Sequence, residues 1–411
     1  MRGERLKHVA EIRVSNVDKK AVEGDPPVLL CNYTDVYYNE RITHDMHFMS
    51  ATATPDQRVT FALNAGDVVL TKDSETADDI GVSAVVLDEV PDLVCGYHLA
   101  IVRARSEVAY GPYLRWVLAG DAARQSMSMA ATGVTRFGLR SDAIADLEVL
   151  LPSLDEQRSI ADYLDRETAR IDALIAAKQR MTVLVRQQAE AHRARWYEQL
   201  AQRSGVVPLR RLIHLLEQGW SPQCDNSPAV GDEWGVLKTS SVSSGAFRAD
   251  ENKRLPAHVR PERRWVVRDG DLLVVRGSGS AGAVGQAAVA HPPNARLLLS
   301  DLLYRVHLVE AAPEFVADAL RASQVRSQLE GAIRTDTGQT LKVRGDDLRA
   351  LLIPALPATA QQRAVEALAS VLRPLAKISD RLTGSIDLLR ERREALITAA
   401  VTGGVTIAAA A

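Results

Sequence analysis

Residues 149–160 read Val-Leu-Leu-Pro-Ser-Leu-Asp-Glu-Gln-Arg-Ser-Ile, and the sequence pattern changes at the proline of this segment. Before the proline, a short run of branched apolar residues is typical of a β-strand. After it, from Asp155 to about Arg203, the chain contains neither glycine nor proline. Apolar residues recur there at helical spacings, which predicts one long amphipathic helix. They include Ile160, Leu164, Ile171, Leu174, Ile175, Met181, Leu184 and Val185.

A second long helix is predicted near the C-terminus. Its leucines at heptad spacing predict a coiled-coil seam, with a kink or break expected at Pro374. A helix of about 45 residues would span about 70 Å, which is too long for a single domain. We therefore expect the two helices to pair antiparallel, although each could instead pack onto its own domain. The heptad leucines are Leu368, Leu375, Leu382, Leu389 and Leu396.

The chain also repeats itself after about half its length. Gly66-Asp67-Val68-Val69-Leu70 is matched by Gly270-Asp271-Leu272-Leu273-Val274, and Gly133-Val134-Thr135 returns as Gly338-Gln339-Thr340. Further on, residues 149–152 match 351–354, and Gln157-Arg158 matches Gln362-Arg363, with all offsets between 202 and 205 residues. This duplication predicts a pseudo-two-fold molecule, which suits a ligand with two similar halves such as duplex DNA.

Both halves show the same order of predicted elements. Short β-branched runs bounded by Gly, Pro, Asn or Asp come first, and they read as strands. A helix beginning near a proline follows, from Pro112 to Ala122 in the first half and from Pro313 to Leu329 in the second. The expected fold is α+β, with two β-rich domains separated by two long antiparallel helices. The predicted strands are at 28–31, 67–70, 83–87, 235–238, 271–275 and 287–290.

The composition is that of an ordinary globular protein, with 46% hydrophobic and 25% charged residues. No apolar run approaches the roughly 18 residues that cross a bilayer, so no membrane role is expected. The three cysteines have no metal-ligand spacing, which favours a reducing cytoplasm without disulfides or zinc. The net charge of −2 means that a DNA-binding face must come from local clustering or from basic partners.

The segment Leu150–Leu164 resembles a hallmark of the specificity subunits of type I restriction-modification systems, and so does the Ile171-Asp172-Ala173-Leu174-Ile175 segment that follows it. The ending Leu388–Gly403 is similar to the usual finish of this family, and Ser15–Lys20 and Leu30–Tyr37 resemble its openings. The second copy carries Gln361 where the family has Glu. The resemblance spans essentially the whole chain.

This resemblance implies a DNA-binding subunit without a catalytic centre. Each target recognition domain would read one half of a bipartite site, and the paired helices would fix the unread spacer. Two methyltransferase subunits, using S-adenosylmethionine, and restriction subunits, using ATP and magnesium, would be the partners; no cofactor is expected on this chain. The implied divisions are 1–152 and 205–354 for the recognition domains, and 153–204 and 355–411 for the helical spacers.

Three motifs that suggest other chemistry are interpreted as structural. Gly277–Gly282 matches the GxGxxG pattern of dinucleotide-binding loops, but the following residues read as a strand rather than a helix. Asp25-Pro26-Pro27-Val28 resembles the box of amino-methyltransferases with valine in place of the stacking aromatic residue, and a turn before a strand is favoured. His44 and His47 have metal-like spacing without a completing carboxylate pattern, so they are taken as loop histidines.

Bases are read by loop residues with hydrogen-bonding or cationic side chains. The candidates lie at corresponding places in the two copies. They are Asn32, Tyr33, Lys72, Thr135, Arg136 and Arg140 in the first half, and Lys238, Thr239, Ser240, Arg276, Ser278, Arg334, Gln339 and Lys342 in the second.

Two other functions remain open at this point. A self-sufficient DNA methyltransferase would bind S-adenosylmethionine unaided. A coiled-coil scaffold without a nucleic-acid role would show no sequence preference on DNA, even with methyltransferase subunits added.

Overall fold

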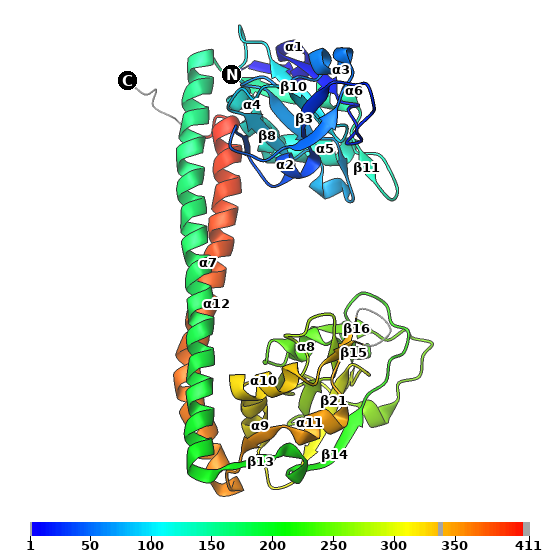
Figure 1. Cartoon of the computed structure of the whole chain (residues 1–411), viewed down its shortest axis with the longest axis vertical. Coiled ribbons are helices and arrows are strands. Elements are labelled where there is room, and N and C mark those ends of the chain that lie inside the picture. Colours follow the sequence, from blue (N-terminus) through cyan, green and yellow to red (C-terminus); the bar gives the residue numbers. More distant parts are fainter. Residues whose placement is uncertain (1, 336–339, 406–411) are drawn as a thin grey trace. The chain divides into compact units, whose positions relative to one another are not determined.

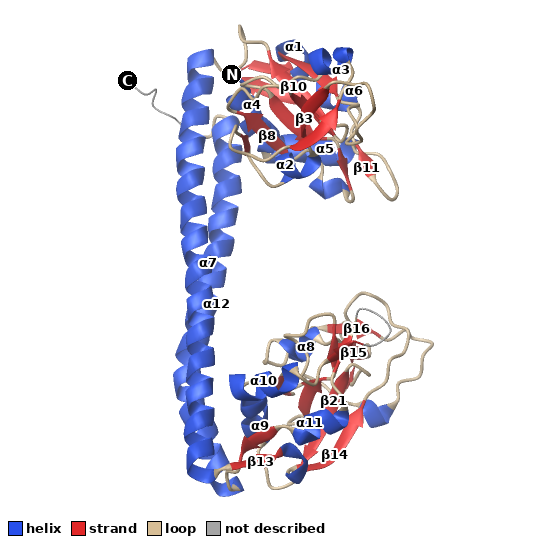
Figure 2. Cartoon of the chain, in the orientation of Figure 1, coloured by secondary structure: helices blue, strands red, loops and turns tan. Residues whose placement is uncertain are grey.

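The computed structural model describes residues 2–335 and 340–405, with the side chains of Arg2, Arg334 and Thr335 left out of the description. The chain divides into two compact units. Unit 1 combines residues 1–179 with residues 384–411, and unit 2 consists of residues 180–383. Each unit contains mixed sheets and short helices together with parts of two long helices (Figures 1 and 2).

Unit 1 is built on a five-stranded sheet with strand order β2-β10-β6-β8-β4. Strand β10 runs antiparallel to β2 and β6, and β4 joins the edge parallel to β8. Every residue of β6 and β8 is buried, which explains why these runs lack the polar alternation of a half-exposed strand. The strands are β2 Ala10–Val14, β4 Arg41–Ile42, β6 Val68–Thr71, β8 Ser83–Val86 and β10 Leu99–Ala104.

Three smaller sheets complete the strands described for unit 1. In the sheet β5-β3-β9, β3 is antiparallel to β5 and parallel to β9. The pairs β1-β12 and β7-β11 are both antiparallel. These strands are β1 Arg2–Arg5, β3 Pro27–Cys31, β5 Met49–Thr52, β7 Asp73–Ser74, β9 Leu93–Cys95, β11 Phe137–Gly138 and β12 Glu148–Leu151.

The short helices of unit 1 cover these sheets. The helix predicted from Pro112 to Ala122 is two helices, α4 and α5, because the backbone of Gly120 is extended (φ −73°, ψ 155°) and interrupts the turn. The helices are α1 Leu6–Val9, α2 Tyr33–Tyr37, α3 Pro55–Thr60, η1 Ala77–Asp79, α4 Gly111–Ala119, α5 Asp121–Ala130 and α6 Ser141–Ala145.

Unit 2 has a four-stranded sheet in the order β14-β21-β17-β19, accompanied by the sheets β16-β15-β20, β18-β23-β22 and β13-β24. The strands are β13 Val206–Pro208, β14 Ile213–Gln218, β15 Gly235–Leu237, β16 Asn252–Arg254, β17 Leu272–Val275, β18 Gly277–Ser278, β19 Ala287–Val289, β20 Leu297–Leu298, β21 Leu303–Leu308, β22 Arg334–Thr335, β23 Leu341–Lys342 and β24 Leu352–Pro354.

The helix predicted from Pro313 to Leu329 is also divided, into α9 and α10, because Ala322 is extended (ψ 141°). The short helices of unit 2 are η2 Leu209–Arg211, α8 Ser240–Ser243, η3 Arg263–Trp265, α9 Pro313–Leu320, α10 Ser323–Glu330 and α11 Gly345–Ala350.

The two units are copies of one module. The central order β2-β10-β6-β8 returns as β14-β21-β17-β19, and β5-β3-β9 returns as β16-β15-β20. The pairing directions agree as well, because β15, like β3, is antiparallel to one neighbour and parallel to the other. The remaining pairs β1-β12 and β7-β11 correspond to β13-β24 and β18-β23. The predicted internal repeat is therefore confirmed for these strands, while β4 and β22 have no counterpart among the described strands.

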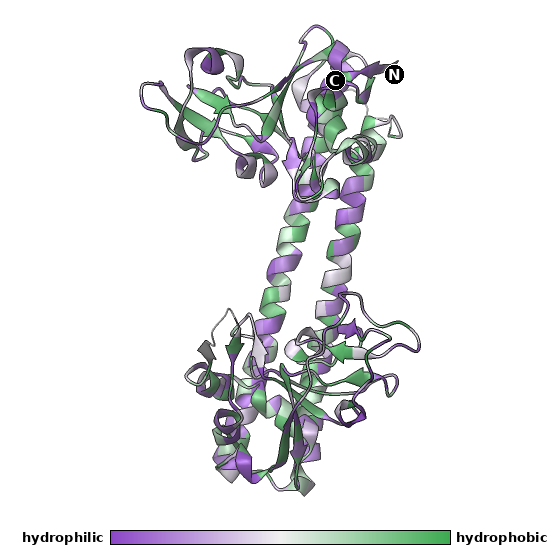
Figure 3. Cartoon of the chain, turned by 90° about the vertical axis from the view of Figure 1, so that its right-hand side faces the viewer, coloured by the Kyte–Doolittle hydropathy of each residue, from purple (hydrophilic) through white to green (hydrophobic). Residues whose placement is uncertain are grey.

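The two long helices are α7, Leu154–Ser204, and α12, Ala358–Val401. Their antiparallel direction follows from contacts inside each unit. In unit 1, Arg393 Nε lies 3.0 Å from Asp172 Oδ1, and in unit 2 the Trp196 indole donates to the carbonyl of Ala364 at 3.0 Å. Hydrophilic and hydrophobic residues alternate along both helices (Figure 3). Among the described residues, no helix has the length and apolar character needed to cross a membrane.

The heptad leucines of α12 form the expected seam. Leu368 and Leu382 are buried, and the other three are half-buried. Of the kink or break expected at Pro374, the break is wrong, because α12 continues through this residue. Pro374 and Ser370 are both exposed, so water can bind the Ser370 carbonyl that loses its helical N–H partner.

A buried glutamine at the start of each long helix ties the helix to its unit. Gln157, which is fully buried, accepts from the N–H of Tyr110 (2.8 Å) and donates to the carbonyls of Val108 and Pro152 (both 3.0 Å). Gln361 is 1% exposed, accepts from the N–H of Ala312 and donates to the carbonyl of Leu356.

This shared role corrects the alignment of the two copies. Gln361, not Gln362, is the counterpart of Gln157, at an offset of 204 residues rather than 205. Gln362 is exposed and lies outside this buried arrangement.

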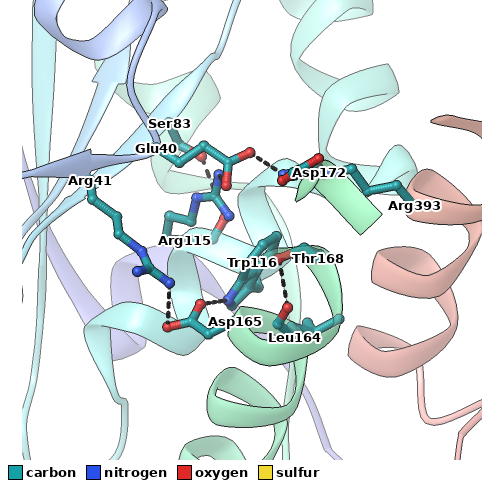
Figure 4. Close-up of polar contacts among 10 residues, drawn as sticks. All are labelled: Glu40, Arg41, Ser83, Arg115, Trp116, Leu164, Asp165, Thr168, Asp172 and Arg393. Carbon is teal, nitrogen blue, oxygen red and sulfur yellow. Dashed lines mark hydrogen bonds and ion pairs between the residues drawn. The ribbon is translucent and has the colours of Figure 1, made fainter. Parts of the chain in front are cut away.

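An ion-pair network joins the loop after α2 to both long helices in unit 1 (Figure 4). The Glu40 carboxylate lies 2.9 Å from Arg115, which is 4% exposed, and also contacts Arg393. Arg393 in turn pairs with Asp172. Burial raises the pKa of Glu40, but the two arginines outweigh this effect and hold the pKa below its usual value.

Candidate nucleic-acid interface

In unit 1, the candidate Lys72 lies at the junction between β6 and β7. Its backbone N–H donates to the carbonyl of His98 (3.0 Å), and its carbonyl accepts from Leu139 (2.7 Å). The Lys72 ammonium and His98 Nδ1 both contact Asp73 Oδ2, at 2.8 and 2.7 Å. The side chains of Lys72 and Asp73 are only 17% and 19% exposed. The backbone therefore holds a cation, an imidazole and a carboxylate together at one edge of the unit.

Beside this junction is a recess of about 380 Å³ that brings Tyr33 and Arg136 together. The Tyr33 ring stacks on Tyr37, with centroids 5.3 Å apart, and the Tyr37 hydroxyl donates to Asp79 at 2.7 Å. This hydrogen bond raises the pKa of Tyr37 to about 12, and burial raises the pKa of Tyr33. Asp73 also lines the recess. An aromatic face with adjacent charged groups can stack on a base and bond its edge.

The other candidates of unit 1 are less directly involved. The backbone N–H of Asn32 donates to Asp35 at 2.7 Å and fixes the start of α2, which carries Tyr33. Thr135 is exposed next to Arg136. Arg140 is exposed and paired with Asp142 at 2.5 Å. It does not line the recess.

The same junction recurs in unit 2 with Arg276 in place of Lys72. The Arg276 N–H donates to the carbonyl of Leu302 (2.8 Å), and its carbonyl accepts from Val343 (2.9 Å). Its guanidinium donates to the carbonyl of Asp301 at 3.3 Å and lies 5.9 Å from the ring centre of Tyr304. The Arg276 Nε is buried without a hydrogen-bond partner among the described residues. The junction is therefore cationic without the adjacent carboxylate of unit 1, because Gly277 follows the arginine.

Ser278 and Lys342 lie on the small sheet beyond this junction. Strand β18 pairs with β23, so that Gly277 is opposite Lys342 and Ser278 is opposite Leu341. Arg334 is opposite Lys342 in the β22-β23 pair, but its side chain is outside the described part, and Gln339 lies outside the described residues altogether.

Lys238, Thr239 and Ser240 form a second group in unit 2, at the end of β15 and the start of α8. The Ser240 hydroxyl donates to Glu251 at 2.6 Å, and the Lys238 ammonium lies 3.4 Å from the same oxygen. The hydrogen bond from Ser240 is the largest cause of the lowered pKa of Glu251. Arg248 pairs with Glu251 as well. These side chains are held in place by one carboxylate.

Four residues of these clusters were not among the sequence candidates: Tyr37, Asp73, His98 and Glu251. Tyr37 and Asp73 lie within five residues of candidates and could have been found from that proximity. His98 and Glu251 lie directly before strands β10 and β16, whose pairing no local signal in the sequence specifies.

The motifs interpreted as structural agree with the fold. Gly277–Gly282 begins as strand β18 and leads through a turn to strand β19, not into a helix. The Asp25–Val28 segment precedes and enters β3, as predicted. His44 is paired with Asp88 at 2.8 Å.

No protein-family model matches the chain. Over 174 residues, it is 32% identical to the specificity subunit of the type I restriction enzyme EcoEI of Escherichia coli. Over 296 residues, it is 22% identical to the specificity subunit of the type I restriction enzyme EcoKI of Escherichia coli strain K12. The chain is thus similar in sequence to the specificity subunits of two type I restriction enzymes. These matches cover 42% and 69% of the chain, but only 28% and 63% of the two relatives.

The fold agrees with this relationship. A structure solved in work on complex assembly and conformational transition of the type I restriction-modification system aligns over 98% of both chains, with a TM-score of 0.64 and 14% identity. At this identity the likeness shows a shared fold. The resemblance drawn from Leu150–Leu164 and the C-terminal ending is thus confirmed.

Proposed function

We propose that the chain is the DNA-specificity subunit of a type I restriction-modification assembly, in which each unit reads one half of a bipartite target. The observation that carries the proposal is the repeated junction, where the same two backbone hydrogen bonds hold Lys72 in unit 1 and Arg276 in unit 2. A module that is duplicated while its polar residues differ is suited to reading two different short sequences. Its relationship to specificity subunits supports the same function.

The chemistry of the two junctions supports different base preferences. An arginine can donate two hydrogen bonds to guanine O6 and N7, which suits Arg276. In unit 1, a carboxylate and tyrosine hydroxyls add acceptors, which suit the amino groups of cytosine or adenine. The net charge of −2 means that much of the phosphate contact would come from partner subunits.

The proposed partners are two methyltransferase subunits and restriction subunits. They would supply S-adenosylmethionine chemistry, ATP and magnesium, while this chain binds no cofactor and catalyses no reaction itself. Double-stranded DNA is the proposed ligand, and the bacterial or archaeal cytoplasm is the proposed location. The recognition domains would be residues 1–152 and 205–354. The helical spacers 153–204 and 355–411 would set the number of unread base pairs.

Methylome sequencing of the host with and without this gene tests the proposal. We expect a bipartite methylated motif that disappears with the gene. Gel shifts of the full chain with its methyltransferase subunits should show preference for that motif. Binding of S-adenosylmethionine by the purified chain alone would favour a self-sufficient methyltransferase. Absence of sequence preference with the subunits present would favour a scaffold, and either result contradicts the proposal.

A further inference from the structure

Unit 2 contains a cavity of about 720 Å³ that the proposed DNA interface does not use. It lies among the second half of α7, the first half of α12, helix α9 and the loop that follows α8. Its volume is in the range of small-molecule sites. Four arginines and two carboxylates provide its charged lining: Arg186, Arg193, Arg321, Arg373, Glu190 and Asp318.

The inner arginines of this cavity are incompletely neutralised. Arg193 is 6% exposed, and its Nε is buried without a hydrogen-bond partner among the described residues. Asp318 Oδ1 lies 3.5 Å from Arg193 Nε and 4.0 Å from Arg321 Nη1. Both distances exceed the 2.7–2.9 Å typical of a charge-assisted hydrogen bond. One carboxylate therefore serves two guanidinium groups, of which Arg193 is buried and Arg321 partly buried, and neither contact is close.

The protonation behaviour of the pair agrees with this geometry. Burial and, to a smaller extent, repulsion by Arg193 lower the pKa of Arg321 to about 10, and Asp318 only partly opposes these two effects. Burial also raises the pKa of Asp318, although both arginines act in the opposite direction. An additional negative charge in the cavity would relieve this imbalance.

Unit 1 shows how the same module supplies that charge. Its loop after α2 carries Glu40, which contacts Arg115 at 2.9 Å and also pairs with Arg393 (Figure 4). The corresponding loop after α8 in unit 2 carries Gly245 and Ala246, both of which line the cavity. The Gly245 carbonyl accepts a hydrogen bond from Arg321 at 2.9 Å, but no carboxylate is present at this place. The counter-charge that is built into unit 1 is thus missing from the loop of unit 2.

We propose that the cavity of unit 2 binds an oxyanion of the phosphate class, which takes the part that the Glu40 carboxylate plays in unit 1. The four arginines exceed the two carboxylates by two charges, which matches a phosphate dianion. Planar guanidinium groups bind phosphate oxygens through paired hydrogen bonds. Inorganic phosphate and the phosphate group of a nucleotide share this chemistry, and the cavity has room for either.

Thermal unfolding of the full-length chain tests the proposal, with sodium phosphate, AMP or sodium chloride added at matched ionic strength. At a ligand concentration of about ten times the Kd, phosphate or AMP should raise the Tm by about 3–5 °C relative to sodium chloride. A rise with phosphate identifies the free anion as sufficient, and a rise with AMP alone identifies a phosphate ester as the ligand. No rise with either would overturn the proposal.

Substitutions localise the effect. Arg321→Met should weaken phosphate binding at least tenfold, as measured by calorimetry. Ala246→Glu provides a second test that leaves all four arginines in place. It puts a carboxylate into the loop, so the Tm without phosphate should rise and phosphate binding should weaken at least tenfold. Ala246→Gln, of similar size without the charge, should bind phosphate like the wild type. Undiminished binding by Ala246→Glu would place the anion elsewhere and refute the proposal.

Discussion

Replacing Gln157 by leucine should destabilise unit 1 strongly, although the two side chains have similar volumes. The Gln157 side chain is fully buried and makes three hydrogen bonds, all to backbone groups. Leucine can make none of them, and it leaves the N–H of Tyr110 without its partner. At about 1 kcal/mol for each hydrogen bond, we expect a loss of about 3 kcal/mol. The same change at Gln361 removes two hydrogen bonds and should cost about 2 kcal/mol.

The neighbouring residue Gln362 provides a matched control. Gln362 is exposed, and its amide donates to Glu366 at 3.1 Å on the same face of α12, so Gln362→Leu should change stability by less than about 0.5 kcal/mol. Hydrogen exchange followed by mass spectrometry can measure the free energy of opening in each unit. We expect Gln157→Leu to lower protection in unit 1 and Gln361→Leu to lower it in unit 2. Equal effects of Gln361→Leu and Gln362→Leu would refute the assignment of Gln361 as the counterpart of Gln157.

Four further predictions concern recognition and the helices. Arg276→Ala and Lys342→Ala should each weaken binding to one half-site by about 1–3 kcal/mol in gel shifts with partner subunits; equal loss at both half-sites would contradict separate readers. Glu40→Gln should lower the free energy of unfolding by about 1–2 kcal/mol at pH 7. The expected loss is small because the Glu40 carboxylate is half-exposed and water screens its ion pairs. Because folding lowers the pKa of Glu40, its stabilisation is present above the unfolded pKa of about 4.3 and is lost as the pH falls through the folded value, so denaturation curves of the two proteins should converge in acid. Pro374→Ala should raise the free energy of unfolding by about 1–3 kcal/mol, because it restores a helical N–H donor and relieves a backbone clash; an unchanged Tm would argue against this. Inserting one helical turn into both α7 and α12 should alter the unread spacer in the methylated motif and leave its two ends unchanged; an identical spacer would exclude the helices as its determinant.

The sequence predicted the large features of the fold because each has a periodic or duplicated signature. The continuous helix α7 followed from a long stretch without glycine or proline, and the seam of α12 followed from its leucines. The strands β3, β6 and β17 were short β-branched runs, and the structure has them within one residue of the predicted bounds. These signals are local, so a single sequence contains them.

The features that were missed depend on contacts between distant segments. The division between α9 and α10 falls in an alanine-rich stretch, where composition favours helix throughout. The correct partner of Gln157 became evident only from its buried hydrogen bonds. Asp73 and His98 of the candidate interface meet through the arrangement of neighbouring strands. Which of the candidate side chains contact bases stays a prediction, because loop conformation in the presence of DNA decides it.

Unit 1 consists of two segments that are far apart in the sequence, which affects how it folds during synthesis on the ribosome. Its largest buried cluster includes Ile397, Ala400 and Val401 from the end of α12, whereas the other buried residues of that cluster lie between Leu6 and Leu164. At typical translation rates, the two parts emerge about 10–40 s apart. The apolar surface that Ile397, Ala400 and Val401 cover in unit 1 therefore stays exposed to water until the whole of unit 2 and most of α12 have been synthesised.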